Sequence, residues 1–186
     1  RNLLALFNNS EPQNQKNATF VRSTIRALVM DPIQTTGYSG IFLSCFSDNH
    51  TSCVDTVKEH TLIYLYAGEQ LIEENGLQLK ITPGECVFVR RDHRITMYKQ
   101  PANGEQYKGI SMTFKRNLLR EFYNKLDKKD IPQKVAVPEE SVFHIPVRPD
   151  ITSLFQSLTP YFDSDVQPTQ EIINLKLQEG IYALLN

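Results

Sequence analysis

Two histidines, His60 and His93, are the first candidates for chemistry in this sequence. An imidazole pair that faces one pocket can act as general acid and general base. His60, however, stands at the start of an expected strand, and His93 lies in a charged turn at residues 90–94. We therefore expect both rings to be solvated or hydrogen-bonded locally, and we expect no catalytic residue and no enzyme activity.

A second candidate group consists of Cys45, His50 and Cys53, whose residue types bind metals. The segment supplies no fourth ligand and no Cys-x-x-Cys spacing, so a chance grouping is the better interpretation. With Cys86 the chain has 3 cysteines, an odd number without the spacing of a disulfide framework. This favours reduced thiols and a cytoplasmic location. The sequence contains no Gly-x-Ser-x-Gly motif, phosphate-binding loop or dinucleotide fingerprint.

Basic residues gather after position 114: they are Lys115, Arg116, Arg120, Lys125, Lys128 and Lys129. They could bind phosphate groups or dock against a DNA-binding domain. Acidic residues at positions 121, 127 and 130 interrupt them, and apolar residues occupy the opposite helical face. The solvated side of an amphipathic helix is therefore the simpler interpretation.

The strands that would position these side chains are clearest between residues 60 and 99. Apolar, β-branched and aromatic runs alternate there with turn signals, which is typical of consecutive antiparallel strands. Asn75-Gly76 predicts a type I′ turn between Leu71-Ile72 and Leu77–Ile81. Several hairpins of this kind predict a small β-barrel or sandwich.

Further strands are expected on both sides of these hairpins. Residues 19–30, 41–46 and 107–114 have strand character, whereas the polar segments 8–18 and 47–60 predict loops. The strand region would thus form a β-barrel sensor domain over residues 1–114.

Helical spacing replaces strand spacing after residue 114. Leu118, Phe122 and Leu126 recur at helical positions, and the four prolines within 128–149 predict an extended connection. Apolar residues from Ile151 to Phe162 then mark a second helix. Thr169 is the expected N-cap of a third helix, whose apolar stripe is Ile173, Leu177, Ile181 and Leu184. We expect the last two helices to pair antiparallel, in a helical linker and dimerisation region over 115–186.

The chain has 186 residues, a net charge of −1 and 40% hydrophobic residues, with a mean hydropathy of −0.35. These values fit one globular domain with a helical appendage. They do not suggest a nucleic-acid coat or a membrane-binding surface. Because the sequence begins at Arg1 and ends within an expected helix, we interpret it as part of a longer protein.

The order of a β-barrel and an amphipathic helix pair resembles the N-terminal half of AraC-family transcription regulators, with type III secretion activators as the most similar subgroup. Residues 60–69 (HTLIYLYAGE) resemble the family's strand-turn-strand element. Residues 81–89 (ITPGECVFV) with Asp92-His93 resemble its Pro-Gly-acidic strand element, and 174–185 (NLKLQEGIYALL) resemble the helix that leads into the DNA-binding half.

This resemblance implies a cupin-like double-stranded antiparallel β-barrel that senses a small-molecule effector or regulatory protein, with helices that form a homodimer. DNA would be bound only by a C-terminal domain outside this chain. Metal-binding cupins carry histidines at defined distances from glycines that match Gly68 and Gly84. Relative to Gly68, the histidine positions hold Asp55 and Val57, or Val54 and Thr56. Relative to Gly84, the histidine position holds Ile95, so none of these residues is His. We therefore expect no metal and no cofactor.

Bulky residues on the central strands could line an effector pocket. The candidates are Tyr64, Tyr66, Phe88 and Met97, with His93 at the mouth. The same rings could instead fill the core, because strand alternation does not reveal which face points inward. The dimer would form through Ile173, Leu177, Ile181 and Leu184. Two alternatives remain open: a module that binds a regulatory protein, and a metal-independent cupin enzyme such as an isomerase.

Overall fold

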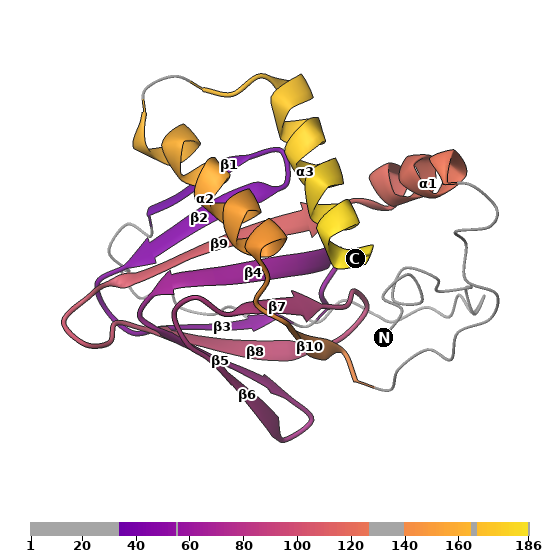
Figure 1. The fold of residues 1–186 in the computed structure, drawn as a ribbon. Coiled ribbons are helices and arrows are strands. Elements are labelled where there is room, and N and C mark those ends of the chain that lie inside the picture. The colour runs from indigo at the N-terminus through magenta and orange to yellow at the C-terminus, as the bar shows by residue number, and fades with distance from the viewer. Residues whose placement is uncertain (1–33, 55, 127–139, 165–166, 186) are drawn as a thin grey trace, which may run out of the picture.

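The computed structural model describes residues 34–54, 56–126, 140–164 and 167–185. The strand expected at 19–30 and the loop expected at 8–18 lie outside these ranges. Two antiparallel sheets and three helices form the described part (Figure 1). The fold class predicted from the sequence, a cupin-like antiparallel β structure followed by helices, is confirmed, with the two sheets arranged as a sandwich.

The larger sheet has six strands in the order β1-β2-β9-β4-β7-β10. Its strands are β1 (Gln34–Tyr38), β2 (Ile41–Phe46), β9 (Tyr107–Phe114), β4 (His60–Ala67), β7 (Cys86–Val89) and β10 (Val142–Ile145). The smaller sheet has four strands in the order β3-β8-β5-β6. These are β3 (His50–Val54), β8 (Ile95–Gln100), β5 (Glu69–Glu74) and β6 (Leu77–Ile81).

The predicted hairpin around Asn75-Gly76 is confirmed. β5 and β6 pair antiparallel from Gln70 opposite Ile81 to Glu74 opposite Leu77. Asn75 and Gly76 have φ values of 50° and 80°, as a type I′ turn requires at both central positions. The expected strands at 41–46 and 107–114 are β2 and β9.

Two strands lie where the sequence predicted irregular chain. Residues 47–60 were expected as a loop but contain β3, which pairs with β8 from His50 opposite Lys99 to Val54 opposite Ile95. The expected extended connection at 128–149 contains β10, which pairs with β7. Both strands are short, and their partners are distant in sequence, so local periodicity does not reveal them.

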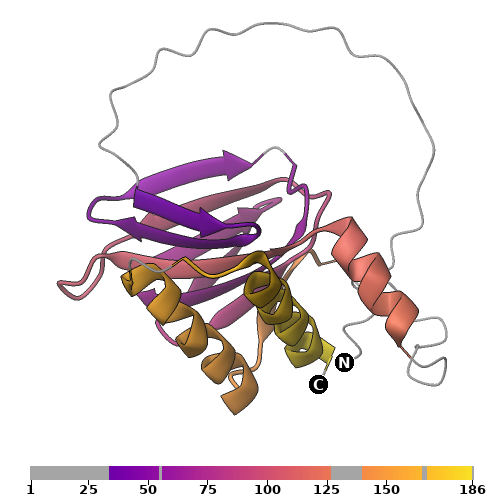
Figure 2. The same cartoon turned by 90° about the horizontal axis from the view of Figure 1, so that it is seen from above.

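Three helices follow the strands: α1 (Arg116–Lys125), α2 (Pro149–Asp163) and α3 (Gln170–Leu185). Figures 1 and 2 show α2 and α3 side by side across the outer face of the larger sheet. The Tyr66 hydroxyl donates to the carbonyl oxygen of Phe155 at 2.6 Å, and that of Tyr38 donates to Tyr161 at 2.9 Å. These bonds join α2 to the sheet. The expected N-cap is also present, because the Ile172 amide donates to Thr169 Oγ1 at 3.4 Å.

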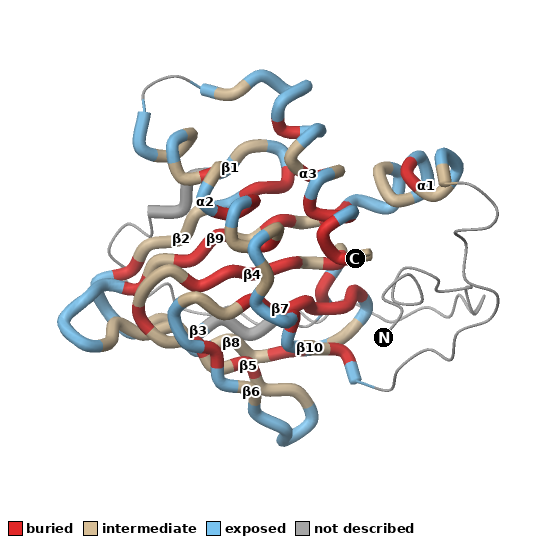
Figure 3. Tube along the Cα trace, in the orientation of Figure 1, coloured by how far each residue is buried: buried red, intermediate tan, exposed pale blue. Residues whose placement is uncertain are grey.

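Two apolar layers form the core, one on each face of the larger sheet. β4 supplies Leu62 and Tyr64 to the layer under the helices, and Ile63 and Leu65 to the layer between the sheets. The middle of β4 is therefore buried on both faces and is drawn red in Figure 3. The boundary predicted at residue 114 falls between β9 and α1, but β10 follows it in the chain. α2 and α3 also share their core with the strands, and the division into two regions stays a prediction.

Candidate functional site: a cavity between the two sheets

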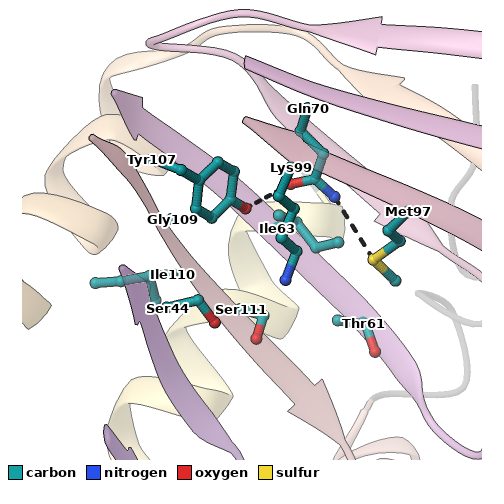
Figure 4. A pocket seen from close by; sticks show the side chains of 10 residues that line it. All are labelled: Ser44, Thr61, Ile63, Gln70, Met97, Lys99, Tyr107, Gly109, Ile110 and Ser111. Atoms are coloured by element: carbon teal, nitrogen blue, oxygen red, sulfur yellow. Dashed lines mark hydrogen bonds between the residues drawn. The ribbon is translucent and has the colours of Figure 1, made fainter. Parts of the chain in front are cut away.

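A cavity of about 100 Å³ lies between the two sheets. The larger sheet contributes Ser44 from β2, Thr61 and Ile63 from β4, and four residues from β9: Tyr107, Gly109, Ile110 and Ser111. The smaller sheet contributes Gln70 from β5 with Met97 and Lys99 from β8. Figure 4 shows these side chains converging on one space. The walls thus combine apolar groups, three hydroxyls of serine and threonine, an amide and an ammonium group.

A short hydrogen-bonded chain fixes one side of the cavity. The Tyr107 hydroxyl donates to Gln70 Oε1 at 2.6 Å, and Gln70 Nε2 donates to the sulfur of Met97 at 3.6 Å. Tyr107 and Gln70 are 1% and 0% exposed, so these bonds satisfy polar groups that water does not reach. Gly109 leaves room for the ring, because a Cβ there would lie 2.7 Å from the Tyr107 hydroxyl oxygen.

Lys99 is the charged residue of the cavity. Its Nζ lies 5.4 Å from the centre of the Phe46 ring and 5.5 Å from that of Tyr107, so two aromatic faces surround the cation. Burial lowers the pKa of the Lys99 ammonium below its usual value of 10.5. No carboxylate in the described part of the chain forms an ion pair with it.

Only one of the five predicted pocket residues, Met97, lines this cavity. Tyr64 and Phe88 are buried on the opposite face of the larger sheet, where Tyr64 stacks on Phe155 of α2 at 4.8 Å between ring centres. Tyr66 faces the same helix through its hydroxyl. His93 lies outside the cavity, with its Nδ1 3.0 Å from Glu74 Oε1.

The two predicted acid–base candidates are not brought together in the cavity. His60 is 1% exposed, stacks on Phe88 at 5.5 Å and accepts a hydrogen bond from the Arg91 amide at 3.3 Å. Burial, followed by the nearby charges of Arg91 and Arg90, lowers its pKa to about 3, so the imidazole is neutral at physiological pH. Both histidines serve local structure, as the sequence suggested.

The apolar stripe predicted to form a dimer is buried within the single chain. Ile173, Leu177, Ile181 and Leu184 are 2%, 4%, 1% and 1% exposed and belong to the core beneath the helices. Gly180 permits the close approach, because a Cβ at this position would lie 3.1 Å from the Met112 methyl carbon of β9. This is a correction to the predicted interface: the stripe covers the chain's own sheet rather than a second copy.

Lys99, Gln70 and Tyr107 were not predicted as site residues. Strand alternation offered a signal for Lys99, since Ile95, Met97 and Lys99 share one face of β8 and the first of them is fully buried. Gly109 within a strand also indicated a close approach. Among the described residues, no cluster of three or more His, Cys, Asp or Glu could hold a metal ion. No described helix is both long enough and apolar enough to cross a membrane.

The two antiparallel sheets with a helix pair across one of them form a cupin-like domain. Residues 60–186 match the model of the family described as the ExsA N-terminal regulatory domain. The chain therefore belongs to this family of regulatory domains of AraC-type transcription activators. Among curated protein sequences, none gives a significant match.

Solved structures with a similar fold include ToxT from Vibrio cholerae. An apo ToxT variant from strain SCE256 matches 77% of this chain and 54% of its own, at 11% identity and a TM-score of 0.56. ToxT from strain O395 bound to (E)-4-(8-methylnaphthalen-1-yl)but-3-enoic acid matches 79% and 57%, at 7% identity and a TM-score of 0.53. The chain thus spans about half the length of the ToxT structures that it matches. A cupin superfamily protein from Desulfitobacterium hafniense matches 48% of this chain and 83% of its own, at 19% identity and a TM-score of 0.37.

Proposed function

We propose that this chain is the effector-sensing and dimerisation part of an AraC-type transcription regulator, and that the cavity between the sheets is its effector site. The observation that carries the proposal is an interior space lined by Lys99 and several hydroxyl groups within a domain of a regulatory family. A pocket with apolar walls and a few polar groups is the usual form of a small-molecule site. DNA would be bound by a further domain of the complete regulator, acting in the cytoplasm.

The proposal divides the chain by role. The strands up to residue 114 would form the sensor, and residues 115–186 would pass the bound state on to dimerisation and DNA binding. Tyr107 begins β9, and β9 also underlies Gly180 of α3. One face of β9 lines the cavity and the other lies under α3. A ligand in the cavity that moves β9 would therefore change the packing of α3.

Filling the cavity tests the sensor role. Ser111→Leu adds an apolar side chain of about the volume of the cavity, whereas Gln78→Leu makes a similar change on the hairpin between β5 and β6. We expect transcription from a promoter under the complete regulator to lose its response to inducing conditions with Ser111→Leu and to keep it with Gln78→Leu. Circular dichroism would verify that both variants fold. A folded, normally abundant Ser111→Leu regulator that still responds would contradict the proposal.

Dimerisation would use the outer face of α3 rather than the predicted stripe. Ile172, Leu175 and Tyr182 are 37%, 59% and 55% exposed, and their spacing places them along one side of the helix. Exposed apolar residues in a row are typical of an interface. The occupant we propose is a second copy of the chain, because regulators that read two-fold symmetric DNA sites pair through self-complementary surfaces.

Sedimentation of two variants tests this interface. Ile172→Glu combined with Leu175→Glu should give a folded monomer, because both side chains are exposed in the single chain. Leu177→Glu should instead unfold or aggregate the chain, because Leu177 is buried in its core. A wild-type chain that sediments as a monomer at high concentration, or a double variant that remains dimeric, would contradict the proposed interface.

The two alternatives predict different outcomes. A module that binds a regulatory protein would keep its response when the cavity is filled and lose it through surface substitutions. A metal-independent enzyme would need an acid–base pair in the cavity, and neither His60 nor His93 is among the residues that line it.

A further inference from the structure

Lys99 places a positive charge in the cavity, and no carboxylate in the described ranges forms an ion pair with it. The acidic residues of the same sheet are engaged elsewhere: Glu69 pairs with Lys80 at 2.6 Å, Glu73 accepts a hydrogen bond from Gln78 at 3.2 Å, and Glu74 contacts His93 at 3.0 Å. Burial alone accounts for the lowered pKa of Lys99, with no opposing effect from a nearby carboxylate. Lys99 is partly buried, and a partly buried ammonium group without a counter-ion is unfavourable unless something else stabilises it.

The aromatic rings provide part of this stabilisation. Phe46 and Tyr107 face the ammonium at 5.4 and 5.5 Å, which is within the range of a cation–π interaction. Such contacts hold the cation in place in the empty domain, but they do not satisfy its three N–H donors. The site therefore holds a cation to which these two rings supply no hydrogen-bond acceptor.

The opposite wall supplies groups that can complete the recognition of an anion. Figure 4 shows the Lys99 side chain extending across the cavity, with its nitrogen directed toward the strands that carry Ser44 and Ser111. Hydroxyl groups donate hydrogen bonds to carboxylate oxygens, and those to charged acceptors are the stronger kind. Ile63 and Met97 add apolar surface beside them, which suits the carbon part of an organic anion better than a fully hydrated inorganic ion.

We propose that the cavity binds a short-chain monocarboxylate whose carboxylate group pairs with Lys99 and accepts hydrogen bonds from the Ser44 and Ser111 hydroxyls. This inference rests on the proposed function, because it names the chemical class of effector for the same site. The volume of about 100 Å³ sets the size. A protein cavity of about 150 Å³ holds benzene, so a ligand here has about four or five non-hydrogen atoms.

Calorimetric titration of the chain with propionate, propionamide and inorganic phosphate tests this class. Propionamide has the shape of propionate without its charge, and phosphate has charge without an apolar part. We expect propionate to bind about 10- to 100-fold more tightly than either. Lys99→Met should weaken propionate binding by a similar factor. Lys108→Met is the matched control, because Lys108 also lies over an aromatic ring, 5.9 Å from the centre of Tyr66, but is not among the cavity residues.

A second experiment measures the charge state of Lys99. In lysine-detected NMR titrations, bound propionate should raise the pKa of Lys99, because an adjacent anion favours the charged form. The pKa of Lys108 should not change. Equal binding of propionate by wild type and Lys99→Met, or the lack of any propionate binding, would overturn the inference.

The outcomes also separate this inference from the proposed function. If propionamide binds as well as propionate and Ser111→Leu abolishes both, the cavity is a ligand site for neutral molecules and only the anion class is wrong. If Ser111→Leu leaves the regulator's response intact and propionate does not bind, both the effector site and the ligand class are wrong.

Discussion

The ammonium nitrogen of Lys99 lies 5.5 Å from the centre of the Tyr107 ring, within the cavity between the two sheets. The ring belongs to the first residue of β9 and the ammonium to the neighbouring sheet, so this contact joins the two walls of the site. It places a partly buried charge, with no ion pair to a described carboxylate, in the wall of the site, and stability is commonly lower where a site is prepared for a ligand.

Replacing Lys99 by methionine should therefore stabilise the ligand-free chain by about 1–2 kcal/mol, because the stem is kept and the buried charge is removed. Urea unfolding at neutral pH measures this. The gain should shrink at alkaline pH, because the lowered pKa makes Lys99 neutral in the folded chain before it is neutral in the unfolded chain. Lys108→Met should change stability by no more than about 0.5 kcal/mol. A Lys99→Met variant that is less stable than the wild type would show that the ligand-free chain already stabilises the ammonium group.

The contributions of Tyr107 and Gln70 to the free energy of unfolding should depend on each other. Tyr107→Phe removes the donor to Gln70 Oε1 and leaves a buried oxygen without a partner, at a cost of about 1–3 kcal/mol. Combining it with Gln70→Met should recover part of the loss, since both polar groups are then absent. A double-mutant cycle by urea unfolding gives the coupling directly. Strictly additive effects would contradict the hydrogen bond as a source of stability.

His60 should make the domain sensitive to acid. The unfolded chain binds a proton at His60 below pH 6.5, whereas the folded chain does so only near its lowered pKa of about 3. Unfolding is thus favoured as pH falls through this window, and the free energy of unfolding should drop by about 2 kcal/mol from pH 7 to pH 5 through this residue.

His60→Gln isolates the effect, because a glutamine can still accept a hydrogen bond from the Arg91 amide. Its free energy of unfolding should vary less between pH 7 and pH 5 than that of the wild type. His144→Gln is the control, since His144 is exposed on β10 and should leave the wild-type slope unchanged. Identical slopes for wild type and His60→Gln would rule out the buried neutral imidazole.

Gly180 should be essential for seating α3. A side chain there meets Met112 and Phe114 of β9, so Gly180→Leu should destabilise the chain by about 1–3 kcal/mol despite the better helix propensity of leucine. Glu179→Leu, one residue earlier on the exposed side, should have little effect. Thermal unfolding compares the two. A neutral Gly180→Leu would place α3 farther from the sheet than the structure does.

The elements with strong local signals could be predicted from the sequence. The Asn75-Gly76 turn requires two positive φ values and has them. The helical spacing of Ile151, Leu154, Phe155 and Leu158 corresponds to the buried side of α2. In each case the determining residues are neighbours in the chain. β3 and β10 could not be predicted in this way, because their strand character depends on pairing with β8 and β7.

The site was harder to predict because the larger sheet is buried on both faces. Tyr64 and Ile63 are adjacent and both apolar, but one packs under the helices and the other lines the cavity. Alternation separates the two faces without telling which one encloses a space. The same ambiguity affected α3, whose apolar stripe could cover its own sheet or a partner. Only the placement of β9 beneath Gly180 distinguishes these arrangements.

Native mass spectrometry of the chain after incubation with a small-molecule extract of its own cells tests the central claim most directly. The claim is that the cavity between the sheets binds a small effector. The account predicts that the wild-type chain retains one small adduct and that the folded Ser111→Leu variant retains none, while Gln78→Leu retains it. An adduct that binds equally to wild type and Ser111→Leu, or no adduct on any of the three chains, would contradict the claim.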